Sequence, residues 1–82
     1  MKRIPTENWK RLLELKQLNR IENLFVEYYE YADKSYATRV VVVINGRQID
    51  GYAECSPKDR YVKPYGRNMA AGRVLKKIII TG

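Results

Sequence analysis

Residues 40–44 are four consecutive valines followed by an isoleucine, and this run constrains the fold more than any other part of the chain. β-Branched side chains are stiff at χ1 and favour the extended backbone of a strand. Asn45 and Gly46 follow at once, and Asn-Gly is the strongest short signal for a type I′ hairpin turn, which needs positive φ at both central residues. Residues 47–55 then alternate in polarity. The sequence therefore predicts an antiparallel hairpin of strands 38–44 and 47–55.

Residues 24–32 carry two conflicting patterns. Their Phe, Val and Tyr content favours a strand. Their periodicity favours a helix, because the apolar residues between Leu18 and Ala32 fall within one arc, and Asn19 with Glu22 matches a capping box. We favour a strand, because a third strand of matching length completes a meander. A helix over residues 19–32 is the alternative, and it would give the order α-α-β-β-α.

Two helices are predicted at the ends of the chain. Thr6 is a candidate N-cap whose hydroxyl would accept a free backbone N–H, and the first helix is expected to end near Leu18. Its buried stripe consists of Trp9, Leu12 and Leu13. The second helix is expected from Gly66 onward, after a loop beginning at residue 58. The stripe of this helix contains Ala71, Val74, Leu75 and Ile78.

These elements predict one small α+β domain over residues 1–82, in the order α-β-β-β-α. Two amphipathic helices and a half-apolar sheet bury each other as two layers, so both helices are expected on one face of a three-stranded antiparallel sheet.

The composition excludes several kinds of chemistry. The chain has no histidine and one cysteine among its 82 residues, which removes Ser-His, Cys-His and His-metal sites and any internal disulfide. No apolar run approaches the roughly 18 residues of a membrane span, and residues 1–5 are basic but lack the apolar stretch typical of a signal peptide. We therefore expect a cytoplasmic, non-enzymatic protein that needs no cofactor or metal and does not enter a membrane.

The charge is segregated along the chain. The net charge is +7, and residues 1–20 and 56–82 are strongly basic, whereas residues 21–35 carry four acidic residues and one lysine. A surface without a partner usually mixes its signs, so segregation raises the expectation of an anionic partner such as RNA or DNA. The four acidic residues, Glu22, Glu27, Glu30 and Asp33, lack the spacing of a calcium loop and are interpreted as a polar face.

The order of elements and part of the sequence are similar to the double-stranded-RNA-binding domain. The residues that carry this resemblance are the valine run 40–44, Asn45-Gly46, Gly51, and the Ala70-Ala71 pair with Leu75. The resemblance implies a duplex-RNA-binding fold whose first helix enters a minor groove. Lys63 and Arg67 stand roughly where that family carries a lysine pair.

A looser pattern, Cys-Ser-Pro-Lys-Asp followed by Gly66-Arg67, Ala70 and Gly72-Arg73, resembles small uncharacterised proteins of phages and mobile elements. That resemblance implies an accessory or anti-defence role. The alternative function is thus an inhibitor, for example an anti-CRISPR protein, that binds a host nucleic-acid enzyme or its bound nucleic acid by protein contacts.

The first candidate site combines basic and aromatic residues. Basic groups neutralise phosphates, tyrosine rings stack on unpaired bases, and a helix N-terminus near Gly66 adds N–H donors. The predicted nucleic-acid-binding residues are Lys58, Arg60, Tyr61, Lys63, Tyr65, Arg67, Arg73, Lys10 and Arg11. For several of these a solvated or packed role is the alternative, and for Arg73 an ion pair with Glu54 or Asp50 is slightly favoured.

The second candidate site is aromatic. If the outer face of the sheet carries several tyrosines, they form an amphipathic surface for a protein partner or a homodimer. The predicted protein-interface residues are Tyr28, Tyr29, Tyr31 and Tyr52. Cys55 is expected to be a buried structural thiol, because no base lies near it in sequence.

Overall fold

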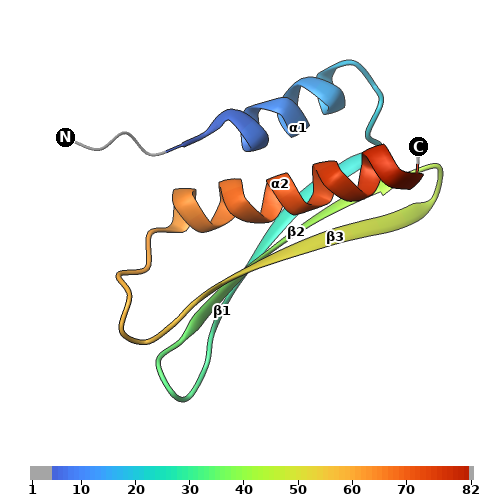
Figure 1. Ribbon diagram of the computed structural model, residues 1–82. Coiled ribbons are helices and arrows are strands. Elements are labelled where there is room, and N and C mark those ends of the chain that lie inside the picture. Colours follow the sequence, from blue (N-terminus) through green and yellow to red (C-terminus); the bar gives the residue numbers. More distant parts are fainter. Residues whose placement is uncertain (1–4, 82) are drawn as a thin grey trace.

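The computed structural model describes residues 5–81, and their side chains as far as Ile79. It has the predicted α-β-β-β-α order and a three-stranded antiparallel sheet in the order β1-β2-β3 (Figure 1). The elements are α1 (Glu7–Gln17), β1 (Asn23–Glu30), β2 (Tyr36–Ile44), β3 (Arg47–Cys55) and α2 (Lys63–Thr81). The predicted fold class is therefore confirmed.

The β2–β3 hairpin forms as its sequence dictates. Asn45 and Gly46 have φ angles of 53° and 75°, the positive values that a type I′ turn requires. The register pairs Val40 with Gly51 and Val42 with Ile49. β2 begins at Tyr36, two residues earlier than predicted, because the meander gives this segment partners on both sides.

Residues 23–30 form an edge strand, so the helical alternative for residues 19–32 is wrong. Asn19 has a φ of 60°, and its N–H donates to the Lys16 carbonyl. The N–H of Arg20 donates to the Leu15 carbonyl at 2.8 Å. These two bonds are those of a Schellman motif, so Asn19 ends α1 instead of starting another helix.

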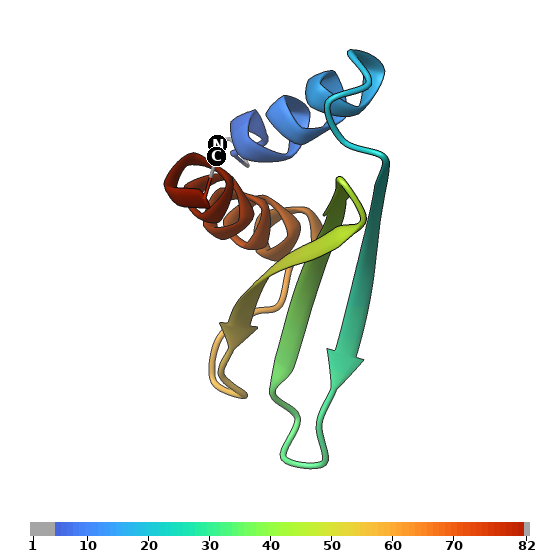
Figure 2. The same ribbon diagram turned by 90° about the vertical axis from the view of Figure 1, so that its right-hand side faces the viewer.

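The main core lies between α2 and one face of the sheet (Figure 2). Apart from Leu12 of α1, its fully buried residues are small or β-branched: Val40, Val42, Ala70, Ala71 and Val74. Small residues allow a close approach of helix and sheet, and a Cβ on Gly51 would lie 2.6 Å from the Ala70 carbonyl oxygen. Gly51 therefore sets the distance between α2 and β3.

α1 lies beside α2 on the same side of the sheet, with limited contact to β1 (Figure 1 and Figure 2). Its Leu12 is fully buried in the shared core, whereas the predicted stripe residue Leu13 is exposed. Thr6 holds the N-cap position, but the prediction that its hydroxyl caps the helix is wrong. The side-chain oxygen of Asn68, on α2, accepts the Trp9 N–H at 3.0 Å instead.

α2 begins at Lys63, three residues before the predicted start, so residues 63–67 are helical and not part of a loop. Pro64 is compatible with this start, because N–H groups in the first turn have no partner within the helix. Gly66 passes close to β2, since a Cβ there would lie 2.7 Å from the Thr38 hydroxyl oxygen.

Candidate nucleic-acid interface

Basic charge is concentrated on the helices. α2 carries five basic residues and no acidic residue, whereas the three strands together carry four acidic residues and two basic ones. The five residues on α2 are Lys63, Arg67, Arg73, Lys76 and Lys77. The helical side of the molecule is therefore the side with positive potential.

The loop of residues 56–62 presents two further basic side chains. It is closed by a turn in which the Asp59 N–H donates to the Ser56 carbonyl at 3.1 Å and the Ser56 hydroxyl donates to Asp59 Oδ2 at 2.9 Å. Lys58 and Arg60 flank Asp59 and are exposed. The loop is short and internally bonded, so these two charges project from a defined backbone.

Tyr61 anchors this loop to the sheet. Its ring stacks on Tyr36 with centroids 4.5 Å apart and planes 6° from parallel, and its hydroxyl shares a 2.8 Å hydrogen bond with Thr38. One face of the Tyr61 ring is therefore already occupied by the ring of Tyr36. The hydrogen bond of the Tyr36 hydroxyl to the Glu30 carboxylate raises the pKa of Tyr36 above its ordinary value.

Two predicted phosphate ligands lie over aromatic rings of the protein itself. The Lys63 ammonium lies 5.0 Å from the centre of the Tyr28 ring. The Arg67 guanidinium lies 4.7 Å from the centre of the Trp9 ring, and its Nε is buried without a hydrogen-bond partner within the described part of the chain. Arg67 therefore links α2 to α1, whereas Lys63 is exposed enough to meet a ligand.

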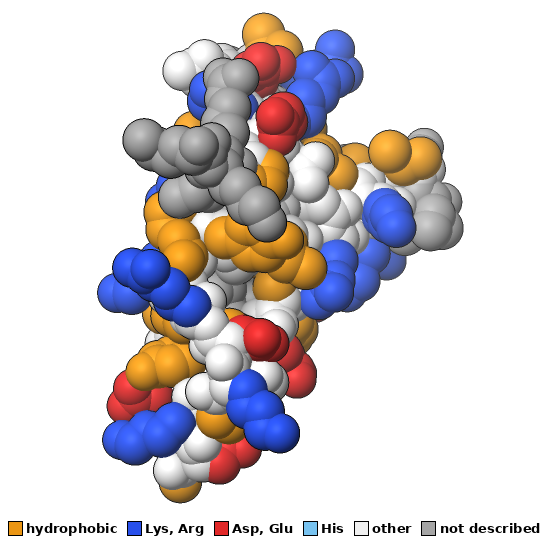
Figure 3. All heavy atoms as spheres, turned by 60° about the vertical axis from the view of Figure 1, so that its left-hand side comes forward, with side chains coloured by type: hydrophobic (Ala, Val, Ile, Leu, Met, Phe, Trp, Pro, Cys, Tyr) orange, Lys and Arg blue, Asp and Glu red, His pale blue; other side chains and the backbone are white. Residues whose placement is uncertain are grey.

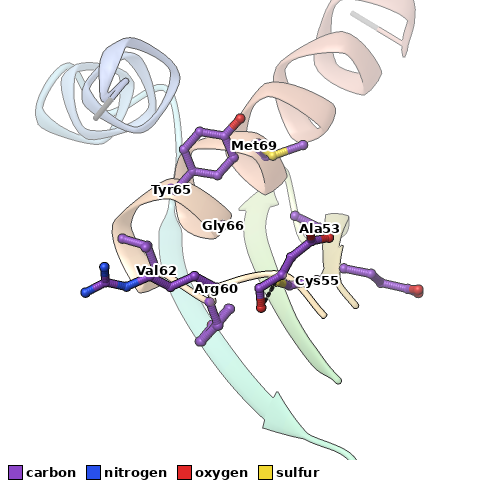
Figure 4. Close-up of a pocket in the computed structure, with 10 residues that line it drawn as sticks. Ala53, Cys55, Arg60, Val62, Tyr65, Gly66 and Met69 are labelled. Atoms are coloured by element: carbon purple, nitrogen blue, oxygen red, sulfur yellow. Dashed lines mark hydrogen bonds between the residues drawn. The ribbon is translucent and has the colours of Figure 1, made fainter. Parts of the chain in front are cut away.

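A pocket of about 280 Å³ opens between β3 and the start of α2 (Figure 4). Tyr65 and Met69 from α2 line one side, and Ala53 and Cys55 from β3 line the other. Arg60 and Asp59 from the loop and Glu54 from β3 also line it, so the pocket carries both signs of charge. Tyr65 is half exposed at this pocket. Of the two tyrosines predicted to bind nucleic acid, it is the one whose ring is better placed to stack on a base.

Farther along α2, Arg73 and Lys76 are exposed. Arg73 donates to the Tyr52 backbone carbonyl, so the expected ion pair with Glu54 or Asp50 is not formed. Asp50 is bonded to Arg39 and Lys77 instead.

On α1, Lys10 is exposed and Arg11 pairs with Glu14 at 3.1 Å. Such an exposed pair is worth little and leaves Arg11 able to exchange partners. On the side seen in Figure 3, Lys and Arg form separate groups with hydrophobic and acidic side chains between them.

The four predicted interface tyrosines do not share a surface. Tyr29 and Tyr52 lie on the face of the sheet that the helices leave open. Tyr28 alternates to the helical face, where it meets Lys63, and Tyr31 lies in the turn after β1. Only Tyr29 and Tyr52 therefore meet the condition of a shared outer face, because residues 28 and 29 are adjacent in a strand and must point to opposite sides. That these four tyrosines bind a protein stays a prediction.

The open face instead carries an ion cluster centred on Arg39. Its guanidinium donates to Glu27 at 2.6 Å and to Asp50 at 3.0 Å, and it lies 5.8 Å from the Tyr52 ring centre. Hydrogen bonds from Arg39 and Tyr29 lower the pKa of Glu27. Burial raises the pKa of Asp50, but the Arg39 hydrogen bond and the Lys77 charge outweigh it, so the net shift is downward.

Cys55 is half-buried, so the expectation of a fully buried thiol is only partly met. Its Sγ lies 3.6 Å from the Asp59 carbonyl oxygen and 3.7 Å from that of Ser56. Among the residues that the structure describes, no three His, Cys, Asp or Glu side chains are grouped as metal ligands would be. Nor does either helix, over its described residues, have the length and apolarity to cross a bilayer.

Three residues of this region were not predicted to take part: Trp9, Tyr36 and Lys76. The sequence does carry a signal for Lys76. With a helix that begins at Lys63, the spacing of four, four and three residues places on one helical face Tyr65, Met69, Arg73 and Lys76. Trp9 and Tyr36 carry no such signal, since their partners lie far away in sequence.

The chain matches no protein-family model, and searches of curated proteins and of solved structures also find no match. The resemblance to the double-stranded-RNA-binding domain therefore rests on the α-β-β-β-α order and the residues named above.

Proposed function

We propose that this chain is a small, non-enzymatic nucleic-acid-binding domain that contacts phosphates through exposed basic residues of α2 and of the loop before it. These residues, together called the basic surface, are Lys58, Arg60, Lys63, Arg73 and Lys76. The observation that carries the proposal is the charge of α2, five basic residues and no acidic one, beside a loop with two more exposed cations.

The dimensions of α2 suit a nucleic-acid backbone. At 1.5 Å per residue, Lys63 and Arg73 are about 15 Å apart along the helix, which is the rise of roughly four base pairs. Several phosphates can therefore be neutralised at once, and each releases counterions.

An unpaired base has one suitable place beside the basic surface. Tyr65 offers an exposed ring at the pocket that Ala53 and Cys55 line, and Arg60 lies at the same pocket. Base–aromatic stacking is worth about 1–3 kcal/mol and depends little on sequence. We expect weak sequence preference, because the basic surface supplies phosphate contacts and no arrangement for reading base edges.

Duplex RNA is the preferred ligand if the family resemblance extends to function. In that case α1, with Lys10 and Arg11, contributes contacts in a minor groove. The separate basic groups on the helical side would then meet phosphates of successive grooves.

The test is fluorescence anisotropy with duplex RNA, duplex DNA and single strands at ~50 and ~200 mM salt. We expect submicromolar binding at the lower salt that weakens steeply at the higher. Lys58→Ala and Lys63→Ala should each reduce the salt slope by about one unit, evenly across sequences. Arg47→Ala is the matched control, because it removes the same charge from the first residue of β3, outside the basic surface.

No binding at low salt would disprove the proposal. Equal effects of Arg47→Ala and Lys58→Ala would show that only net charge matters and would disprove the assignment of the surface. Absence of nucleic-acid binding would favour the alternative, an inhibitor that contacts a host nucleic-acid enzyme.

A further inference from the structure

The two edges of the sheet are finished differently. At the β3 edge, side chains of α2 bond the backbone carbonyls that face away from β2. Arg73 donates to the Tyr52 carbonyl, and the Lys77 ammonium donates to the Asp50 carbonyl at 2.5 Å. These bonds occupy acceptors that another strand would need, so α2 protects this edge against further pairing.

Among the residues that the structure describes, no other element protects the β1 edge in this way. The N–H of Tyr31 donates to the carbonyl of Ser35, the residue opposite it. In an antiparallel pair, hydrogen-bonded and non-hydrogen-bonded residues alternate, so this bond shows which residues of β1 bond to β2. Every second residue of β1 therefore directs its backbone N–H and carbonyl away from β2. These residues are Leu24, Val26, Tyr28 and Glu30.

Among the described residues, a single side chain forms a hydrogen bond with one of these outward backbone groups. Asn23, the neighbour of Leu24, accepts the Leu24 N–H at 2.9 Å. The rest of this edge, through Val26, Tyr28 and Glu30, keeps a row of backbone donors and acceptors that can add a strand.

The open edge also has a distinct charge. Residues 22–33 contain four of the nine acidic residues of the chain and no basic residue, in a protein of net charge +7, and the one α2 cation that the described residues place over this strand is Lys63, above the Tyr28 ring. Glu22 and Glu30 are exposed at the two ends of the open stretch, and between them lie the half-buried Leu24 and Val26. Nucleic acid is therefore repelled here, and a second copy of β1 would bring its own carboxylates to the same edge.

We propose that the open edge of β1 takes up an extended, basic segment of a partner protein as a fourth strand. Backbone hydrogen bonds to Val26, Tyr28 and Glu30 supply the affinity. Lysine or arginine residues of the partner lie near Glu22 and Glu30, and its apolar residues extend the core beside Leu24 and Val26. This binding mode leaves the basic surface free apart from Lys63, whose ammonium lies over the Tyr28 ring, so the domain can hold a protein and a nucleic acid together.

The probe is an acetylated and amidated peptide of about eight residues, in which terminal lysines flank alternating valine and threonine. Its matched control has glutamates in place of the lysines. Titration of the ¹⁵N-labelled protein should give binding for the basic peptide and at least about tenfold weaker binding for the acidic one. Hydrogen exchange should slow at Val26, Tyr28 and Glu30, whose N–H groups face outward, and not at Phe25 or Glu27.

Tyr28→Pro and Tyr28→Ala separate edge pairing from side-chain contacts. Both variants remove the ring from Lys63, but only proline removes the outward N–H, and proline is tolerated on edge strands. We expect Tyr28→Ala to bind the basic peptide at least about tenfold more tightly than Tyr28→Pro. The exchange pattern of the unsubstituted protein tests the same point if Tyr28→Pro does not fold.

Four results would overturn the proposal. Equal binding of both peptides would remove the charge argument. Protection at amides outside the outward set, or equal binding by the two Tyr28 variants, would place the peptide elsewhere. A doubling of mass without peptide, lost in Tyr28→Pro and kept in Tyr28→Ala, would assign the edge to a second copy of this chain.

Discussion

The two helices are attached to this molecule in different ways. α2 packs directly on the sheet, and its closest approach is made possible by Gly51 and Gly66. α1 is held largely through α2, which supplies the side chain that accepts the Trp9 N–H and the guanidinium over the Trp9 ring. The position of α1 therefore depends on its contacts with α2, whereas the position of α2 depends on its packing against the sheet.

The largest expected effect on stability comes from disrupting the packing of α2 against the sheet. In Gly51→Val the new Cβ alone would lie 2.6 Å from a backbone oxygen of α2, so the helix must move. We expect a loss of about 3 kcal/mol in the free energy of unfolding, measured by urea denaturation. Gly46→Ala is the control, because its Cβ has open space and only the positive φ is strained, at a cost of about 1 kcal/mol. A smaller loss in Gly51→Val than in Gly46→Ala would contradict the close approach.

A smaller effect tests how α1 depends on α2. Asn68→Ala leaves the part-buried Trp9 N–H without its acceptor, which should lower stability by about 1–2 kcal/mol. Thr6→Ala should cost less than about 0.5 kcal/mol, because the Thr6 hydroxyl makes no capping bond. Both variants are compared by urea denaturation and by hydrogen exchange of the α1 amides. The reverse order of effects would mean that α1 is capped from its own sequence.

The smallest effect concerns the face that neither helix covers. Glu27 and Asp50 have lowered pKa values, so their bonds to Arg39 stabilise the folded state above the ordinary values of 4.5 and 3.8. This stabilisation is lost as the pH falls through the lower pKa values of the folded protein. The urea midpoint should therefore decline more steeply below about pH 4 in the native protein than in Arg39→Met. Parallel profiles for the two proteins would exclude a role of the cluster in acid stability.

Prediction from sequence succeeded where the signal was local. The hairpin followed from the valine run and Asn45-Gly46, whose side chains restrict their own backbone. The start of α2 was placed late, because Tyr65 and Gly66 resemble loop residues and a proline precedes them. Residues 23–30 satisfied both the strand and the helix pattern, and pairing with β2 decided between them.

The candidate site was predictable in part. The exposure of Lys58, Arg60 and Lys63 was predictable, because lysine and arginine side chains in or near a loop are rarely buried. The packing of Arg67 on Trp9 did not follow, because the rings that attract a cation are supplied by a distant segment.

The sequence by itself determined the register of the β2–β3 hairpin and the excess of positive charge on the last helix. Each depends on residues that are neighbours in the chain or share one helix. Only the tertiary structure decided which residues cap α1, which tyrosines share a face, and which edge of the sheet stays open. Those features depend on where α2 lies against β3, and packing over long sequence separations sets that position.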